Sequence, residues 1–166
     1  MKFNYYGFKA IYVHEMNRFI RTVGQSILSP VISTSLYFVV FGSVIGGYIE
    51  KIDGVSYGSF IVPGLLMLTL LTQSISNTSF GIFFPKFNGT MYEILAAPIS
   101  TLETVLAFVG AGATKTLMVG TVIFITATFF AEVTVMYPIL MIFLLVLVSF
   151  TFALFGFLIG VVSKNF

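Results

Sequence analysis

Long stretches without charge constrain this sequence more than any other feature. Four runs contain no charged residue apart from Lys115: 22–49, 54–85, 104–131 and 133–163. Each run is longer than the roughly 20 residues that a helix needs to cross about 30 Å of hydrocarbon. Only 8% of all residues are charged, against about 25% in soluble domains. So few charges cannot cover a water-soluble fold, and the chain is expected to be an integral membrane protein.

The runs predict an all-α fold, a polytopic membrane helix bundle. The four membrane helices are expected near 24–46, 59–83, 104–130 and 138–162. A β-barrel would need segments of about 10 residues with alternating polarity, whereas these runs are continuously apolar. Two pairs of glycines, Gly42 with Gly46 and Gly156 with Gly160, have the spacing that lets membrane helices approach closely.

The distribution of Lys and Arg predicts the orientation of the bundle, because positive loops stay in the cytoplasm. Six basic residues lie in the N-terminal segment, in the connection after the second span and in the C-terminal tail. The two remaining loops together contain a single basic residue, Lys51. Both termini and the loop 85–103 are therefore expected on the cytoplasmic side.

The N-terminal segment, residues 1–23, has the pattern of an amphipathic helix. Five large residues recur at helical spacing and form one stripe: Tyr5, Phe8, Tyr12, Met16 and Phe19. We expect a helix that lies in the cytoplasmic interface with this aromatic stripe towards the lipid. The alternative is an ordinary basic flank that anchors the first span.

The loop 85–103 is the longest cytoplasmic connection between spans. Asn88-Gly89 is a turn signal, and Thr90 with Glu93 has the spacing of a capping box. Pro85 is expected to end the second span, and Pro98 to end a short helix within the loop. The apolar residues of that short helix need a cover, which could be lipid headgroups, the bundle itself or a docked partner.

Polar residues inside the spans are the next candidates for function. Lys115 lies about 16 Å into the third predicted span at 1.5 Å per residue, and Gln73 and Asn77 make the second span unusually polar. An intramembrane lysine is costly, so it should face the bundle interior or a cavity. We leave two readings open for Lys115, a structural ion pair and a residue of a transport path. The stretch Gly110–Thr116 resembles a phosphate-binding loop, but Thr114 precedes the lysine where that loop needs glycine.

Several classes of site are not expected. The sequence has no cysteine and one histidine, which leaves no set of residues for a metal cluster. No carboxylate pair and no nucleophile beside a base is apparent, so no catalytic residue is predicted. A net charge of +2 is too small to suggest a nucleic-acid partner.

Four stretches in order resemble the permease subunit of ABC-2 type bacterial exporters. They are HEMNRFIR at 14–21, SPVISTSLYFVVFG at 29–42, SFIVPGLLM at 59–67 and FNGTMYEILAAPIS at 87–100. The resemblance implies a multi-pass protein of the bacterial cytoplasmic (inner) membrane. In that family two permease copies, here a homodimer, pair with two ABC ATP-binding subunits. ATP and Mg would bind only to those subunits, and this chain would bind no cofactor.

The resemblance also implies roles for particular residues. The contact that couples the permease to the ATPase would involve Asn88, Gly89, Thr90, Tyr92 and Glu93. Glu15, Arg18 and Arg21 would belong to the interfacial element beside it. The substrate would be hydrophobic or amphipathic, such as a drug, a lipid or a polysaccharide, and would leave the cytoplasm.

The family has six spans and this chain shows four, so 1–166 is expected to be an incomplete permease domain. It would be either a fragment or a shortened protein that a partner completes. Two other functions are weighed. A small four-span secondary antiporter would need a proton-linked carboxylate in the membrane, and none of the predicted spans contains one internally. A non-transporting membrane scaffold would have no ATPase partner.

Overall fold

A computed structural model describes residues 3–45, 51–52 and 54–163. In this part of the chain, helices account for nearly all of the structure, and four are long and apolar enough to cross a membrane. They are Val23–Phe41, which joins α2 (Val23–Tyr37) to the start of the π-helix η1 (Phe38–Ile45), and α3 (Tyr57–Phe87), α5 (Thr101–Phe130) and α6 (Pro138–Val162). The expected all-α membrane bundle is confirmed. Gly46 of the first predicted glycine pair lies outside the described residues.

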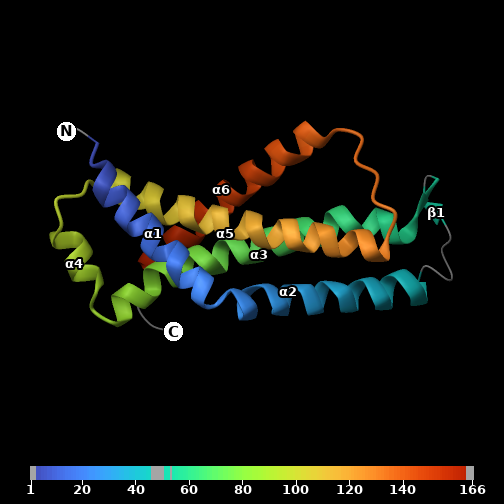
Figure 1. The fold of residues 1–166 in the computed structure, drawn as a ribbon, viewed down its shortest axis with the longest axis horizontal. Helices are drawn as coiled ribbons and strands as arrows, with labels where there is room; N and C mark the ends of the chain where they lie inside the picture. The colour runs from blue at the N-terminus through green and yellow to red at the C-terminus, as the bar shows by residue number, and fades with distance from the viewer. Residues whose placement is uncertain (1–2, 46–50, 53, 164–166) are drawn as a thin grey trace.

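The remaining elements close the two ends of the bundle (Figure 1). α1 (Tyr5–Arg21) and the short α4 (Met91–Ala96) lie at one end, which we call the α4 end. A small antiparallel hairpin of β1 (Lys51–Ile52) and β2 (Val55–Ser56) lies at the other end. The start of α1 and the end of α6 both lie at the α4 end, as a bundle with an even number of spans requires.

α5 is the central helix of the bundle. In its most apolar window 56% of the residues are buried, compared with 22% or less in the other three spans. Small residues make this possible, because Ala107, Ala111, Gly112 and Ala113 leave room for neighbouring helices to approach. The glycine- and alanine-rich stretch that carries Lys115 is therefore a packing surface within the bundle.

The second span is longer than predicted. α3 has 31 residues, about 46 Å at 1.5 Å per residue, so it extends beyond the hydrocarbon. Ser56 caps its start by accepting a hydrogen bond from the Ser59 N–H group. The expectation that Pro85 ends the helix is wrong, because α3 continues to Phe87. A proline loses one backbone hydrogen bond, and here that loss falls in the last turn before the chain leaves the helix.

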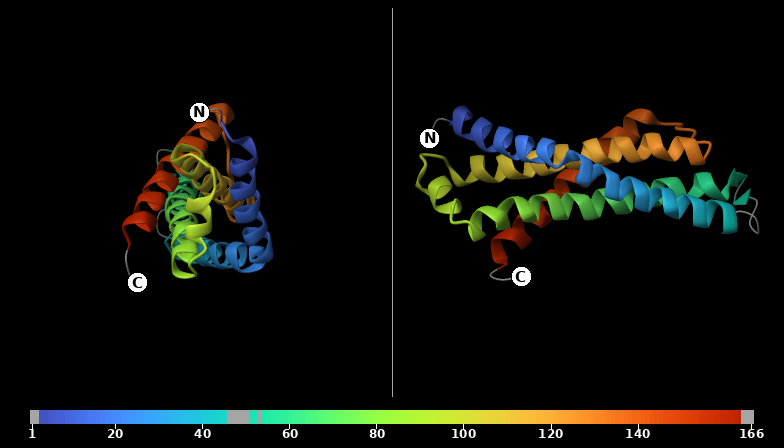
Figure 2. Two further views of the ribbon diagram at one scale, coloured as in Figure 1. Left: turned by 90° about the vertical axis from the view of Figure 1, so that its left-hand side faces the viewer. Right: turned by 60° about the horizontal axis from the view of Figure 1, so that its bottom comes forward.

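α6 crosses α3 obliquely, and the two helices pack closely where they cross, a contact that we call the seam (Figure 2). Gly156 and Gly160 of α6 lie against the α3 backbone: a Cβ atom on Gly156 would come within 2.5 Å of the Ile75 carbonyl oxygen. The buried Ser74 hydroxyl donates a 2.6 Å hydrogen bond to the Ser149 carbonyl oxygen. Gly156 and Gly160 thus have the close-packing role that their spacing predicts.

Replacing Gly156 with alanine should destabilise the bundle by about 1–3 kcal/mol, because the α3 backbone cannot move aside cheaply. Gly64 of α3 is the matched control, since a Cβ atom there meets nothing within 4 Å. Gly64→Ala should be neutral or stabilising by up to about 1 kcal/mol. Thermal unfolding of the purified variants in detergent measures both effects. Equal unfolding temperatures for G156A and G64A would contradict the seam.

Candidate functional site

The connection between α3 and α5 forms a compact tip at the α4 end. α3 ends at Phe87, Asn88 caps it, and Gly89 has a φ of 78°, which reverses the chain direction into α4. This left-handed conformation suits glycine. The predicted capping box at Thr90 and Glu93 is not formed: Thr90 is helical and its side chain makes no capping hydrogen bond. The turn at Gly89 already directs the chain into α4, since the Tyr92 N–H group donates to the Gly89 carbonyl oxygen at 3.1 Å.

α4 has one packed side and one exposed side. Met91 and Ile94 pack on the apolar cluster around Ile82 and Phe108. Tyr92 is 77% exposed and Leu95 is 72% exposed. We call the exposed residues of this connection the α4 tip: Phe87, Asn88, Thr90, Tyr92, Glu93 and Leu95. Four of the five residues predicted for a coupling contact therefore lie on one exposed surface, and the fifth, Gly89, forms the turn behind it.

The start of α1 is held to the start of α5. Glu103 accepts hydrogen bonds from the backbone N–H groups of Asn4, at 2.6 Å, and Ser100, at 2.8 Å. Ser100 and Glu103 form a true capping box on α5, the motif that the sequence analysis placed ten residues earlier. The Asn4 side chain caps α1 and also donates to the Pro98 carbonyl oxygen at 3.1 Å. The N-terminal helix is thus attached to the chain segment that follows the α4 tip.

α1 turns a different side to the bundle from the one predicted. Its buried residues are Ile11, Glu15 and Phe19, and it packs on α5. The aromatic stripe is divided: Phe19 enters the core, Tyr12 donates a 3.0 Å hydrogen bond to the Thr114 hydroxyl, and Tyr5 is 58% exposed. The expectation that the aromatic stripe faces lipid is wrong for Tyr12 and Phe19. The small residues of α5 form a packing surface for them, which the spacing within α1 does not reveal.

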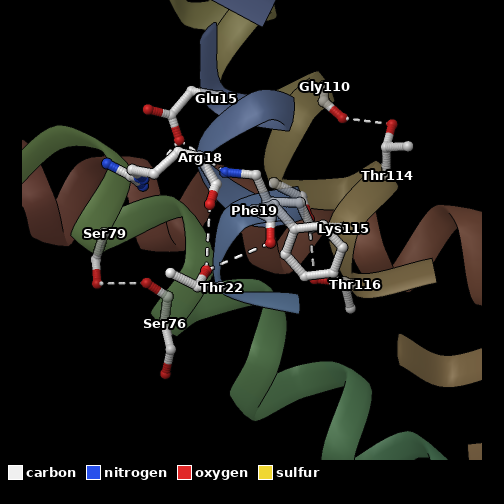
Figure 3. A network of polar contacts seen from close by, with 11 residues as sticks. Glu15, Arg18, Phe19, Thr22, Ser76, Ser79, Gly110, Thr114, Lys115 and Thr116 are labelled. Carbon is white, nitrogen blue, oxygen red and sulfur yellow. Dashed lines mark hydrogen bonds and ion pairs between the residues drawn. The ribbon is translucent and has the colours of Figure 1, made fainter. Parts of the chain in front are cut away.

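A buried ion triad joins α1 to the middle of α5 (Figure 3). Lys115 Nζ lies 2.7 Å from Glu15 Oε2, and Arg18 Nη2 lies 2.8 Å from the same oxygen. Glu15 is 2% exposed and Lys115 is 3% exposed, whereas the Arg18 side chain keeps 34% of its exposure. The sequence analysis grouped Glu15 with Arg18 and Arg21. In the structure Glu15 is buried, Arg18 is half-buried and Arg21 is exposed.

The triad explains how a lysine is accommodated within a membrane helix. Removing a charge from water costs several kcal/mol unless a partner is held in good geometry. Glu15 supplies that partner for Lys115 across 100 residues of sequence. The arrangement is compatible with the structural-pair reading of Lys115. The second carboxylate oxygen of Glu15 makes no hydrogen bond to any described residue.

The polar residues of α3 lie on two sides of the helix. Ser74 and Thr78 are buried, whereas Gln73 and Asn77 are half-buried. The Asn77 amide nitrogen is buried without a partner among the described residues, and so is the Thr78 hydroxyl. Thr78 meets Gly112 of α5, and Gly81 faces the Glu15 carboxylate. The polar part of α3 therefore passes beside the triad rather than along a separate surface.

Sequence reasoning missed three residues that connect the elements. Asn4 and Glu103 form the link described above, and Lys86 holds the end of α6. Lys86 Nζ donates to the carbonyl oxygens of Gly160, Val161 and Ser163, at 3.2, 2.7 and 2.9 Å. The last carbonyls of a helix lack partners within it, and a cation near them is favourable. The Ser100–Glu103 spacing could have revealed one of these links, but no local pattern signals the other two.

Comparison with known proteins places the chain among membrane transport proteins. A family model described as ABC-2 type transporter matches residues 6–166. Two similar curated proteins, from Escherichia coli (strain K12) and Shigella flexneri, are each named inner membrane transport permease YadH. Each is 37% identical over 158 residues, which cover 95% of this chain. The chain spans 62% of the length of these relatives. No solved structure gives a significant match.

Replacing Lys115 with methionine should destabilise the bundle by about 3–5 kcal/mol, because it leaves Glu15 as a buried carboxylate with only Arg18 beside it. Glu15→Gln should also destabilise the bundle, because it leaves Lys115 as a buried cation without its negative partner. The double variant E15Q/K115M should recover most of the loss, since no buried charge is left unpaired. Thermal unfolding of the four proteins gives the coupling energy. Losses that simply add would contradict the pairing.

Proposed function

This chain belongs to the ABC-2 type transporter family, and from that premise we propose that it is the membrane-spanning permease subunit of an ATP-driven exporter. The bundle described above is its transmembrane domain, in a bacterial inner membrane. ATP and Mg bind to a separate ATP-binding subunit, and nucleotide binding and hydrolysis there drive the permease between two states. The proposed substrate class is hydrophobic or amphipathic, because the exposed surface of the bundle is largely apolar.

The observation that carries this proposal is that the exposed α4 tip is attached to four other helices. α3 leads into it directly, and one residue before α3 ends, Lys86 holds the end of α6. On the other side, the segment after α4 is bound to α1 through Asn4 and to α5 through Ser100 and Glu103. A force on the tip would reach α1, α3, α5 and α6 through packed or hydrogen-bonded contacts.

The proposed docking site for the ATPase is the α4 tip. Tyr92 and Leu95 give an exposed apolar surface, and Glu93 adds a negative charge to it. Aromatic residues framed by polar groups are typical of interface centres. With the ATPase on the cytoplasmic side, the proposal puts the α4 end in the cytoplasm together with the start of α1 and the end of α6, and the distribution of Lys and Arg supports this orientation. Two permease copies would pair so that each presents one tip.

A secondary antiporter is the main competing function, and the structure changes one argument about it. Glu15 is a buried carboxylate that the sequence analysis did not place inside the bundle. Its Oε2 atom already contacts two cations, Lys115 and Arg18, so its charge is compensated within the chain. A proton-coupled site needs a carboxylate that the transport path reaches, whereas Glu15 is enclosed between α1, α3 and α5. A non-transporting scaffold would not explain why the exposed α4 tip is connected to several membrane helices.

Co-purification with candidate ABC ATP-binding subunits from the same genome tests the proposal. Glu93→Lys and Tyr92→Ala should each weaken the complex by about tenfold or more, because they alter the centre of the proposed contact. Glu132→Lys, the same charge reversal at the hairpin end of the bundle, is the matched control and should bind normally. Equal binding by all variants would contradict the tip as the contact. Failure of the unmodified chain to bind or stimulate the ATPase would contradict the permease assignment itself.

A further inference from the structure

A cavity lies at the hairpin end of the bundle, at the opposite end from the α4 tip. The start of α6 stands apart from α5 and α3 there, and residues 131–137 connect it to the end of α5 (Figure 1). The space between α3, α5, this connection and α6 has a volume of about 390 Å³. Cavities of roughly 300–1,000 Å³ are typical of sites for small molecules. We call this space the hairpin-end cavity.

The walls of the hairpin-end cavity are mainly apolar and can adapt to a ligand. Three of the residues that line it are methionines, Met67, Met136 and Met141, and two are aromatic, Phe124 and Tyr137. Methionine is unbranched and polarisable, so it adjusts to ligands of different shape. Aromatic rings add large apolar contact area and attract cations to their faces. Such walls suit a compact apolar body and tolerate a positive charge on it.

One carboxylate lies at the edge of this cavity. Glu132 is the only charged residue among those that line it. Its backbone is held to the start of α3, because the Ser59 hydroxyl donates a 2.8 Å hydrogen bond to the Glu132 carbonyl oxygen. Its side chain is exposed, and its carboxylate forms no ion pair with any described residue. The connection between α5 and α6 therefore presents an unpaired negative charge beside an apolar space.

We propose that the hairpin-end cavity binds an amphiphile with a compact apolar body and a single positive charge. The body lies against Phe124 and Met141, and the charge lies beside Glu132. An anionic ligand is disfavoured, because no lysine or arginine among the lining residues offsets Glu132.

This site narrows the substrate class given above, and in that respect it rests on the proposed function. With the α4 end in the cytoplasm, as proposed, the cavity lies on the side where an exported molecule leaves. Binding itself needs only the helix bundle and not the ATPase partner. Failure of binding would therefore leave the ATPase complex unaffected, and failure of the ATPase complex would leave binding measurable.

Tetraphenylphosphonium and tetraphenylborate test the proposal, because they have nearly the same shape and opposite charge. The full chain has no tryptophan, so Phe124→Trp places a single reporter at the cavity wall, and each ion is titrated in nonionic detergent. We expect a saturable change in tryptophan emission with the cation. The anion should bind at least about tenfold more weakly, because Glu132 repels it. Leu154→Trp, at an exposed position of α6 outside the cavity, is the matched control and should show no saturable change.

Two variants at Glu132 test the role of its charge, and neither should affect folding because the side chain is exposed. Glu132→Gln should weaken cation binding about fivefold, the effect of losing a partly exposed ion pair. Glu132→Asp keeps the charge and should retain most of the affinity. Equal affinity for the two ions, or a cation affinity that is unchanged in E132Q, would overturn the proposal. Matching, unsaturated responses of F124W and L154W would also overturn it, because the cation would then only partition into the detergent.

Discussion

The arrangement of this bundle depends on a positive charge in the middle of its central helix. Lys115 lies in α5, where 56% of the most apolar window is buried, and an isolated charge there would be unstable. Glu15 supplies the opposite charge at 2.7 Å, and it comes from a helix that does not itself span the membrane. The ion pair therefore fixes the N-terminal helix to the transmembrane core, and it does so near the point where α1 passes into the first span.

Small residues and hydrogen bonds extend this attachment to the rest of the bundle. Ala107, Gly112 and Ala113 let neighbouring helices come close to α5, while Gly156 and Gly160 let α6 come close to α3. Lys86 joins the end of α6 to the last turn of α3, and Glu103 joins the start of α1 to the start of α5. These contacts converge on the short segment around α4. For a permease driven by a separate ATPase, as proposed, such convergence would let one docking contact move several membrane helices.

The sequence predicted much of the fold because hydrocarbon demands long apolar helices, and all four spans were found close to their expected positions. It located the tip from Asn88-Gly89, since glycine at a positive φ leaves a clear local signal. It failed where two distant segments decide the outcome. Periodicity within α1 gave a stripe that includes Tyr12 and Phe19, but the small residues of α5 select which side is buried. The partner of Lys115 lies 100 residues away, so no spacing rule could connect it to Glu15.

The central claim is that the ion pair holds α1 on α5, and cross-linking tests it most directly. The chain has no cysteine, so Tyr12→Cys with Thr114→Cys would give one unique pair at a contact where the native side chains are 3.0 Å apart. A short bifunctional thiol reagent applied in membranes should join the two helices in the otherwise unchanged chain. The yield should fall strongly when Lys115→Met is added. An equal yield with and without Lys115 would show that α1 stays in place for another reason and would contradict the account.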